Sequence, residues 1–282
     1  MLASREIITP NTFEVHIPWQ NHLQIARQMI ISRGGLKDMG DSGDAFVNFL
    51  ARWFAYLDVI GSLSGHKNDV PLSEGYWSLR DETISKSGFA IDCFFGFTNC
   101  CISLLARVAK LAHECDAERI DEHGDVDLDW QPASETREAA EKLERDLLES
   151  RHHVHRGCRH SQAIEEPAED VQEIVSVNES FHLAGLIHLY RRVLGMPSGD
   201  AEVQKCVRQV LTALGQVRKG GTAESSLLFP MFTAGCDARE PEHREMILER
   251  LKLVEGLGMS HVSDTIRMRC SMAWELMLTG CV

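Results

Sequence analysis

The sequence predicts an all-α protein: a single multi-helix domain, an irregular helical bundle, spanning residues 1–282. Apolar residues recur at steps of three and four in one segment after another, which is the spacing of one helix face. No useful length of chain alternates apolar and polar residues, and Asn-Gly and Asp-Gly hairpin turns do not occur. With 282 residues, of which 44% are apolar and 25% charged, the chain can bury a sizeable core.

The part of the chain before residue 195 predicts five helices, at residues 19–33, 44–63, 90–115, 136–149 and 174–194. Each contains apolar residues at helical spacing, and charged residues interrupt the longer apolar runs. No run reaches the roughly 18 uncharged residues that a membrane-spanning helix needs. The N-terminus also lacks the basic and apolar regions of a secretory signal. We therefore expect an intracellular protein without a membrane segment.

The second predicted helix carries an acidic residue inside an apolar segment. Phe54, Leu57 and Ile60 follow one another at steps of three and predict the packed face, with Gly61 permitting close approach of a neighbour. We expect Asp58 to cap a neighbouring helix or to pair with an arginine, which is a structural role.

Three further helices have clear start or stop signals. The helix at 200–217 follows Asp200, a suitable N-cap, and the helix at 242–257 follows Pro241, which suits a first turn. Between them, Pro230 predicts a kink in the helix of residues 225–238 because proline lacks a backbone donor.

The last predicted helix repeats apolar residues at intervals of four. These are Val262, Ile266, Cys270 and Trp274, with Met277 following at three. This spacing places Trp274 on the inward face, together with Ile266, Cys270 and Met277.

Two acidic loop insertions are expected, near residues 116–135 and 150–172. Residues 115–150 contain thirteen acidic and four basic side chains, so this stretch carries most of the net charge of −13. The pI near 5.4 argues against binding of nucleic acid phosphates by this chain and against anionic membranes. The nine cysteines include no C-x-x-C pair, which argues against a zinc ribbon or cluster and favours reduced, buried thiols.

A histidine-rich segment is the strongest candidate for metal chemistry. It contains His152, His153, His155, Cys158 and His160, and imidazole and thiol groups are good ligands for zinc or copper. The spacing matches no structural zinc pattern, and neighbouring arginines oppose a cation, so a basic loop is the competing interpretation. A helical metal-binding enzyme using His152, His153, His155 and His160 is therefore kept as the alternative function.

Other motifs give weaker signals for catalysis. Glu-x-x-His, which builds di-iron sites in helical bundles, occurs three times. The pairs are Glu149/His152, Glu179/His182 and Glu240/His243.

The remaining motifs favour structural roles. His113-Glu114 lacks the second histidine of a zinc protease, and residues 218–221 favour a helix stop and turn over a phosphate loop. His22 and His188 on apolar helices, and Trp19, Trp53 and Trp274, are most simply core residues. We expect no catalytic, cofactor-binding or metal-binding residue, and no enzyme activity.

Several segments, in order, resemble one known family. They are WQNHLQIARQMIISRGG at 19–35, FAYLDVIGSLSG at 54–65, GFTNCCISLLARVAKLA at 96–112, HLAGLIHLYRRVLGMP at 182–197 and SSLLFPMFTAGCDA at 225–238. The closing tryptophan helix with Trp274 follows them. This set resembles the fungal-specific transcription factor domain, the regulatory region of fungal zinc-cluster regulators.

The resemblance implies an all-helical regulatory domain that acts in the nucleus and controls transcription by RNA polymerase II. It implies transcriptional co-regulators or a second copy of the chain as partners, and a small apolar ligand such as a sterol for some members. Members also carry an N-terminal six-cysteine zinc cluster that binds DNA. This chain lacks that pattern, so we expect no cofactor here and no direct DNA binding by any of its residues.

The resemblance begins partway into the family's regulatory domain, so we expect the domain to be N-terminally incomplete. If upstream helices are missing, the helices that they would cover should expose apolar residues to water. The first candidates for such exposure are Leu2, Ile7, Ile8, Leu23, Ile30 and Ile31.

Overall fold

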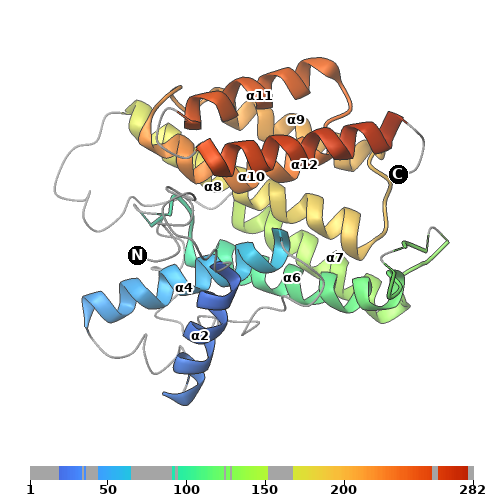
Figure 1. Cartoon of the computed structure of the whole chain (residues 1–282), viewed down its shortest axis with the longest axis horizontal. Helices are drawn as coiled ribbons and strands as arrows, with labels where there is room; N and C mark the ends of the chain where they lie inside the picture. Colours follow the sequence, from blue (N-terminus) through green and yellow to red (C-terminus); the bar gives the residue numbers. More distant parts are fainter. Residues whose placement is uncertain are drawn as a thin grey trace, which may run out of the picture.

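The computed structural model describes residues 19–33, 35, 44–64, 91–92, 95–123, 125–127, 129–151, 168–255 and 260–278. Within these ranges the chain forms nine α-helices, and the all-α prediction is confirmed (Figure 1). They are α2 (Trp19–Ser32), α4 (Ala45–Ser64), α6 (Asn99–Arg119), α7 (Ser134–Arg151), α8 (Ala168–His188), α9 (Ala201–Gly215), α10 (Leu228–Asp237), α11 (Pro241–Val254) and α12 (Ser260–Leu278). A π-helix, η2 (Leu189–Val193), continues α8, and a 3₁₀ helix, η3 (Thr222–Leu227), precedes α10. The only β-pairings among the described residues are two isolated bridges.

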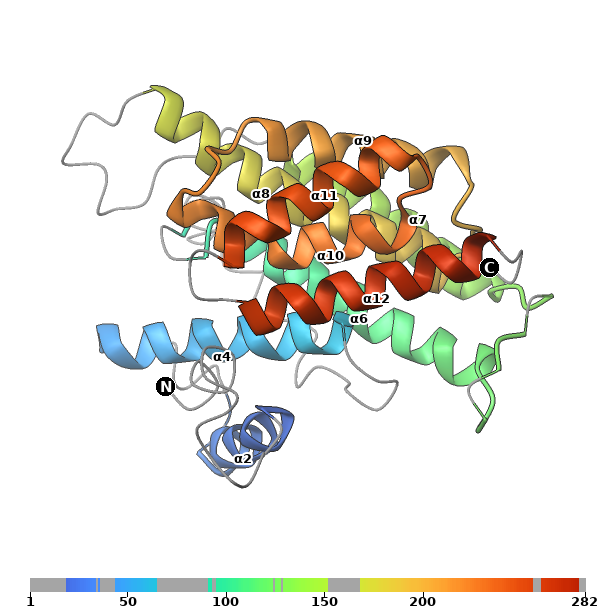
Figure 2. The same ribbon diagram turned by 45° about the horizontal axis from the view of Figure 1, so that its top comes forward.

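Helix α8 runs through the middle of the bundle. It packs against α6 and α7 on one side and against α9 and α10 on the other. Helices α11 and α12 lie outside α10, whereas α4 packs on α6 and α2 projects from α4, as both ribbon views show (Figures 1 and 2). Gly185 permits the close crossing of α8 and α6, because a Cβ there would lie 2.7 Å from Leu105 Cδ2.

Helix α6 begins later than the sequence predicts, at Asn99 rather than near residue 90. The reason is local. Gly96 has a positive φ of 78°, which no helix accommodates, and the Thr98 hydroxyl accepts a hydrogen bond from Cys101 N as an N-cap. The other predicted caps are present: Asp200 accepts from Glu202 N at 2.8 Å, and Pro241 occupies the first turn of α11.

Pro230 does not kink a helix, which corrects the sequence prediction. Helix α10 begins at Leu228, so Pro230 lies in its first turn, directly after the 3₁₀ helix η3. Backbone N–H groups in a first turn have no intrahelical acceptor, so the missing donor costs no hydrogen bond there.

The packed face of α4 also differs from the prediction. Leu57 and Ile60 are only half-buried. The fully buried line instead passes through small and polar residues together with Phe54, namely Ala51, Ala55, Asp58, Val59 and Ser62. The spacing is helical, but Leu57 and Ile60 lie on the opposite side of the helix from these buried positions.

The first acidic insertion is shorter than expected. The loop between α6 and α7 spans residues 120–133, because residues 116–119 form the last turn of α6. Its described residues are mostly exposed. Of the second insertion, residues 150–151 end α7, residues 168–172 open α8, and residues 152–167 lie outside the described residues.

Trp274 faces inward, as predicted. Its side chain is 9% exposed and packs in the core with Ile266 and Cys270, while the Met277 side chain lies outside the described residues. The indole Nε1 donates a hydrogen bond of 2.6 Å to Gly235 O on α10, and the Arg244 guanidinium lies 5.1 Å from the ring centroid. Trp274 therefore joins α10, α11 and α12.

We predict that Trp274→Ala lowers the free energy of unfolding by about 3–5 kcal/mol, through lost burial and the cavity left behind. Denaturant unfolding monitored by circular dichroism measures this change. Met272→Ala is the matched control, because Met272 is exposed on the same helix and its loss should change stability by no more than about 0.5 kcal/mol. A Trp274→Ala variant that unfolds like the wild type would contradict the assigned register of α12.

Candidate regulatory core and interaction surface

A row of aromatic rings crosses the core from α4 to α10. Neighbouring ring centroids lie 4.6–5.9 Å apart, within the range of favourable aromatic contacts. In order, the row contains Tyr56, Phe95, Phe97, Phe181, Phe229 and His188. Burial raises the pKa of Tyr56 to about 12, so its hydroxyl stays protonated at physiological pH.

His188 ends this row as a buried, neutral imidazole. Its ring stacks on Phe229 with an interplanar angle of 3°, and Nε2 lies 3.2 Å from Thr233 Oγ1. Burial, and secondarily the positive charge of Arg192, lower the pKa of His188 from 6.5 to about 3. The sequence interpretation of His188 as a hydrogen-bonded core residue agrees with this environment.

An acidic residue of α6 links three helical segments. Asp116 Oδ2 accepts from Arg192 Nε at 3.0 Å and Nη2 at 2.6 Å, and Asp116 Oδ1 accepts from Arg119 Nη2 at 2.9 Å. Arg192 Nη1 also donates to Leu63 O at 3.1 Å. Arg192 projects from the π-helix η2, a type of irregularity that often marks functional sites. The ends of α4 and α6 are thereby tied to η2.

A second charged pair lies under α11. Glu224 is 0% exposed, and its Oε1 accepts from Arg250 Nη1 at 2.7 Å. Arg250 Nη2 also donates to Leu214 O and Val217 O, and Gly220 N donates to Glu224 Oε2. The predicted turn at 218–221 is confirmed, and these contacts make it a structural element. Removing one member of such a pair would leave a buried charge without its partner.

One predicted Glu-x-x-His pair contains a buried histidine with hydrogen-bonding partners. His182 is 0% exposed; its Nδ1 donates to Asn178 O at 2.8 Å, and its Nε2 lies 3.0 Å from Ser150 Oγ. The Cys100 thiol lies 3.4 Å from Ser150 Oγ. Ser150 is itself buried, so this Cys–Ser–His arrangement holds α6, α7 and α8 together rather than presenting a nucleophile to solvent.

The other metal candidates are not brought together in the described part of the chain. There, no group of three or more His, Cys, Asp or Glu side chains could hold a metal ion. Glu240 is exposed at the start of α11, and His243 is half-buried on its first turn. His152, His153, His155, Cys158 and His160 lie outside the described residues, so the metal site there stays a prediction.

Asp58 pairs with an arginine, which is one of the two roles that the sequence predicted. The Arg27 guanidinium of α2 contacts Asp58 Oδ1, and the carboxylate is 0% exposed. Ile30 is buried beside this pair, which corrects the expectation that it would face water, and Leu23 is half-buried. Leu2, Ile7 and Ile8 lie outside the described residues, while Ile31 is exposed as expected.

Helices α2 and α4, which pack against each other, both expose large apolar side chains, which sequence reasoning missed. The most exposed of these are two pairs spaced by four residues, so each pair lies on one helix face. They are Ile25 (57% exposed), Met29 (54%), Phe46 (66%) and Leu50 (38%), and we call them the α2–α4 surface. Phe49 and Leu57, which are half-buried, extend it along α4. Trp53 and Ile60 are half-buried as well but pack against the core, which agrees with the sequence interpretation of Trp53 as a core residue. The signal in the sequence was the second apolar stripe of α4.

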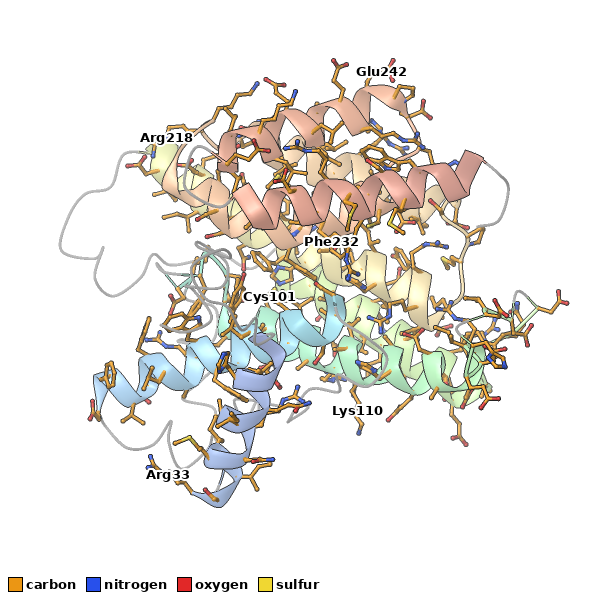
Figure 3. The ribbon with its side chains drawn as sticks, in the orientation of Figure 1. Arg33, Cys101, Lys110, Arg218, Phe232 and Glu242 are labelled. Carbon is orange, nitrogen blue, oxygen red and sulfur yellow. The ribbon has the colours of Figure 1, made fainter. Side chains whose placement is uncertain are left out.

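Few charges interrupt the α2–α4 surface. Apart from Asp58, the one charged residue of α4 is Arg52, and it pairs with Asp92 at 2.5 Å. In both ribbon views the start of α4 lies at the opposite end of the molecule from the acidic 120–133 loop (Figures 1 and 2). In Figure 3, which draws the side chains, Arg33 lies at the end of α2, and Glu242 lies on α11 at the opposite edge of the molecule.

We predict that His188→Gln removes a pH-dependent loss of stability. The unfolded histidine takes up a proton below about pH 6.5, whereas folded His188 stays neutral until about pH 3. Acidification through this window therefore favours the unfolded state of the wild type by about 1.4 kcal/mol per pH unit. Between pH 7 and about pH 4.5, the variant's stability relative to wild type should rise by about 2–3 kcal/mol.

Urea unfolding at both pH values measures this difference, and glutamine keeps a hydrogen-bonding group for Thr233. His123→Gln serves as the control, because His123 lies exposed in the acidic loop. Parallel pH profiles for wild type and His188→Gln would contradict a neutral buried imidazole.

Comparison with known proteins gives a single result. A family model of the fungal specific transcription factor domain matches the chain over residues 1–282. No curated protein and no solved structure matches the chain significantly. Among the described residues, no helix has the length and apolar character to cross a membrane. The match covers the same ordered segments that carry the resemblance in the sequence, and the fold is all-helical as that resemblance implies. The chain belongs to the fungal-specific transcription factor domain family.

Proposed function

We propose that this chain is the regulatory, protein-interaction domain of a fungal transcription factor, acting in the nucleus on transcription by RNA polymerase II. Membership in the family supports a regulatory role in transcription. The observation that carries the interaction role is the α2–α4 surface, where large apolar side chains lie exposed at helical spacing. Exposed apolar patches of this kind mark binding sites in soluble proteins.

We infer that the occupant of this surface is a second copy of the chain. Two copies with a net charge of −13 repel each other, most strongly where the acidic 120–133 loop and α7 lie. The α2–α4 surface has few charges and lies away from that loop, so repulsion between two copies is weakest there. Helix pairs with apolar residues at steps of four are also able to pack against an identical pair about a two-fold axis.

The α2–α4 surface favours protein association over sensing of a small ligand. Its exposed apolar residues lie on the outside of the molecule, whereas buried polar groups of the core such as Asn178, His182 and Glu224 bond to other groups of the protein. A small apolar ligand, implied for some family members, stays a prediction from the resemblance.

We predict that the purified chain forms a dimer that Phe46→Glu and Leu50→Glu each weaken at least about tenfold, or 1.4 kcal/mol, by placing charges in the contact. Analytical ultracentrifugation over a concentration series measures the dissociation constant. Helix content should not change, because both positions are exposed.

Met268→Glu and Met272→Glu are matched controls, since these methionines are equally exposed on α12, outside the α2–α4 surface. They should dimerise like the wild type. A stable monomer at tens of micromolar that binds no hydrophobic dye would contradict the proposal. A monomer that binds the dye through Phe46 and Leu50 would instead assign the surface to a co-regulator and refute self-association.

We also predict that the chain alone does not bind duplex DNA at physiological salt. Its net charge of −13 repels the phosphate backbone, and it contains no six-cysteine cluster. A gel-shift titration over several salt concentrations tests this. Salt-sensitive binding below micromolar protein would show that the prediction is wrong.

A further inference from the structure

Two thiols from different helices meet where α12 crosses α10. Cys236 lies near the end of α10 and is half-buried, and Cys270 lies in the middle of α12 and is 0% exposed. The Cys270 Sγ atom lies 4.0 Å from Phe232 O. Phe232, labelled in Figure 3, precedes Cys236 by four residues, so the two share one face of α10.

The absence of a side chain at residue 235 lets the sulfur approach this closely. A Cβ at Gly235 would lie only 2.7 Å from Cys270 Sγ, so any other residue there would have to displace that sulfur. The Cys270 sulfur thus lies against the turn formed by residues 232–236, and the Cys236 thiol hydrogen-bonds to it.

Trp274, which lies C-terminal to Cys270 on α12, fixes the crossing of α10 and α12. Its indole Nε1 donates to Gly235 O at 2.6 Å, one turn further along α12 than Cys270. Ile247 of α11 also lies close to Gly235, with Cγ2 3.5 Å from the same Cβ position. The two sulfurs are therefore held beside each other by packing around them, and their contact does not depend on the thiols alone.

We propose that Cys236 and Cys270 are an oxidation site, at which a peroxide converts the two thiols into a disulfide that joins α10 to α12. The Cys236 sulfur attacks one peroxide oxygen; the O–O bond breaks, and a sulfenic acid and water form. The Cys270 sulfur then attacks the sulfenic sulfur, the S–O bond breaks, and a second water leaves. Two thiols lose two electrons and two protons in total, and hydrogen peroxide is reduced to two waters.

Cys236 is the sulfur that meets the oxidant, because it is the half-exposed member of the pair. The hydrogen bond that the Cys236 thiol donates to Cys270, together with burial and the charge of Asp237, raises the pKa of the Cys236 thiol, and Arg269 lowers it by a smaller amount. Since the thiolate is the reactive form, oxidation is slow and needs sustained exposure to peroxide. Cys270 is shielded from solvent and reacts with the sulfenic acid that forms beside it.

The disulfide would close a loop that contains the whole of α11. Cross-linking a loop of this size restricts the unfolded chain and stabilises the folded one. The oxidised form should therefore hold α10, α11 and α12 as one unit, while the buried face of Trp274 stays unchanged.

The test uses the full chain, treated with hydrogen peroxide for several hours and then alkylated. We expect peptide mapping by mass spectrometry to find a Cys236–Cys270 cross-link, and the melting temperature to rise by several degrees. Dithiothreitol should reverse both changes. Cys236→Ser should abolish the cross-link and the rise in melting temperature, and its half-buried position makes it the safer substitution for folding.

Cys206→Ser is the matched control, because Cys206 is buried on α9, away from this crossing, and should leave the cross-link intact. The proposal is overturned if both Cys236 and Cys270 remain alkylatable in folded, peroxide-treated protein. It is equally overturned if Cys236 is found joined to a different cysteine. Neither result bears on the α2–α4 surface, so the two proposals fail independently.

Discussion

The burial of α8 on all sides is the constraint on which the rest of the structure depends. Every residue from Ser180 to Tyr190 is buried, so polar side chains on this helix must find partners inside the protein. Each partner comes from a different neighbour. Asn178 accepts from Thr98 N before α6, His182 bonds to Ser150 of α7, and His188 bonds to Thr233 of α10. Near its start, Glu173 accepts three hydrogen bonds from Arg218, after α9. Apolar packing alone would tolerate several arrangements of these helices, whereas unsatisfied polar groups would destabilise the wrong ones.

The sequence allowed prediction of the helices better than of their faces. Caps and turns are local, so Asp200, Pro241 and the turn at 218–221 could be assigned from adjacent residues. The effect of Pro230 could not be assigned in this way, because it depends on where α10 begins. The 3₁₀ helix before α10 has no clear sequence signal. For Asp58 the sequence left open a helix cap or an arginine partner, since Arg27 lies 31 residues away in another helix.

The α2–α4 surface could not be recognised from the sequence for a related reason. Helix α4 is apolar on two faces, and periodicity does not say which of them meets the core. The size of Trp53 suggested full burial, yet the core accepts the small residues Ala51 and Ala55, because α6 crosses close to α4. The polar network of α8 was hidden likewise: a buried histidine and an exposed one have the same sequence signature, and only the packing distinguishes His182 from His123.

The aromatic row provides a continuous packed connection between the two regions for which we propose roles. It begins at Tyr56 on α4, the helix of the α2–α4 surface, and ends at Phe229 and His188 beside α10, the helix that carries Cys236. Large rings in van der Waals contact transmit displacement because a close-packed interior leaves little free volume to absorb it. Arg192 adds a second connection, since it contacts both Asp116 of α6 and the end of α4 from the π-helix that follows His188. The polar bonds of α8 fix it in turn against α10. The exposed N-terminal helices and the C-terminal helices are thus joined by packed contacts through one buried helix.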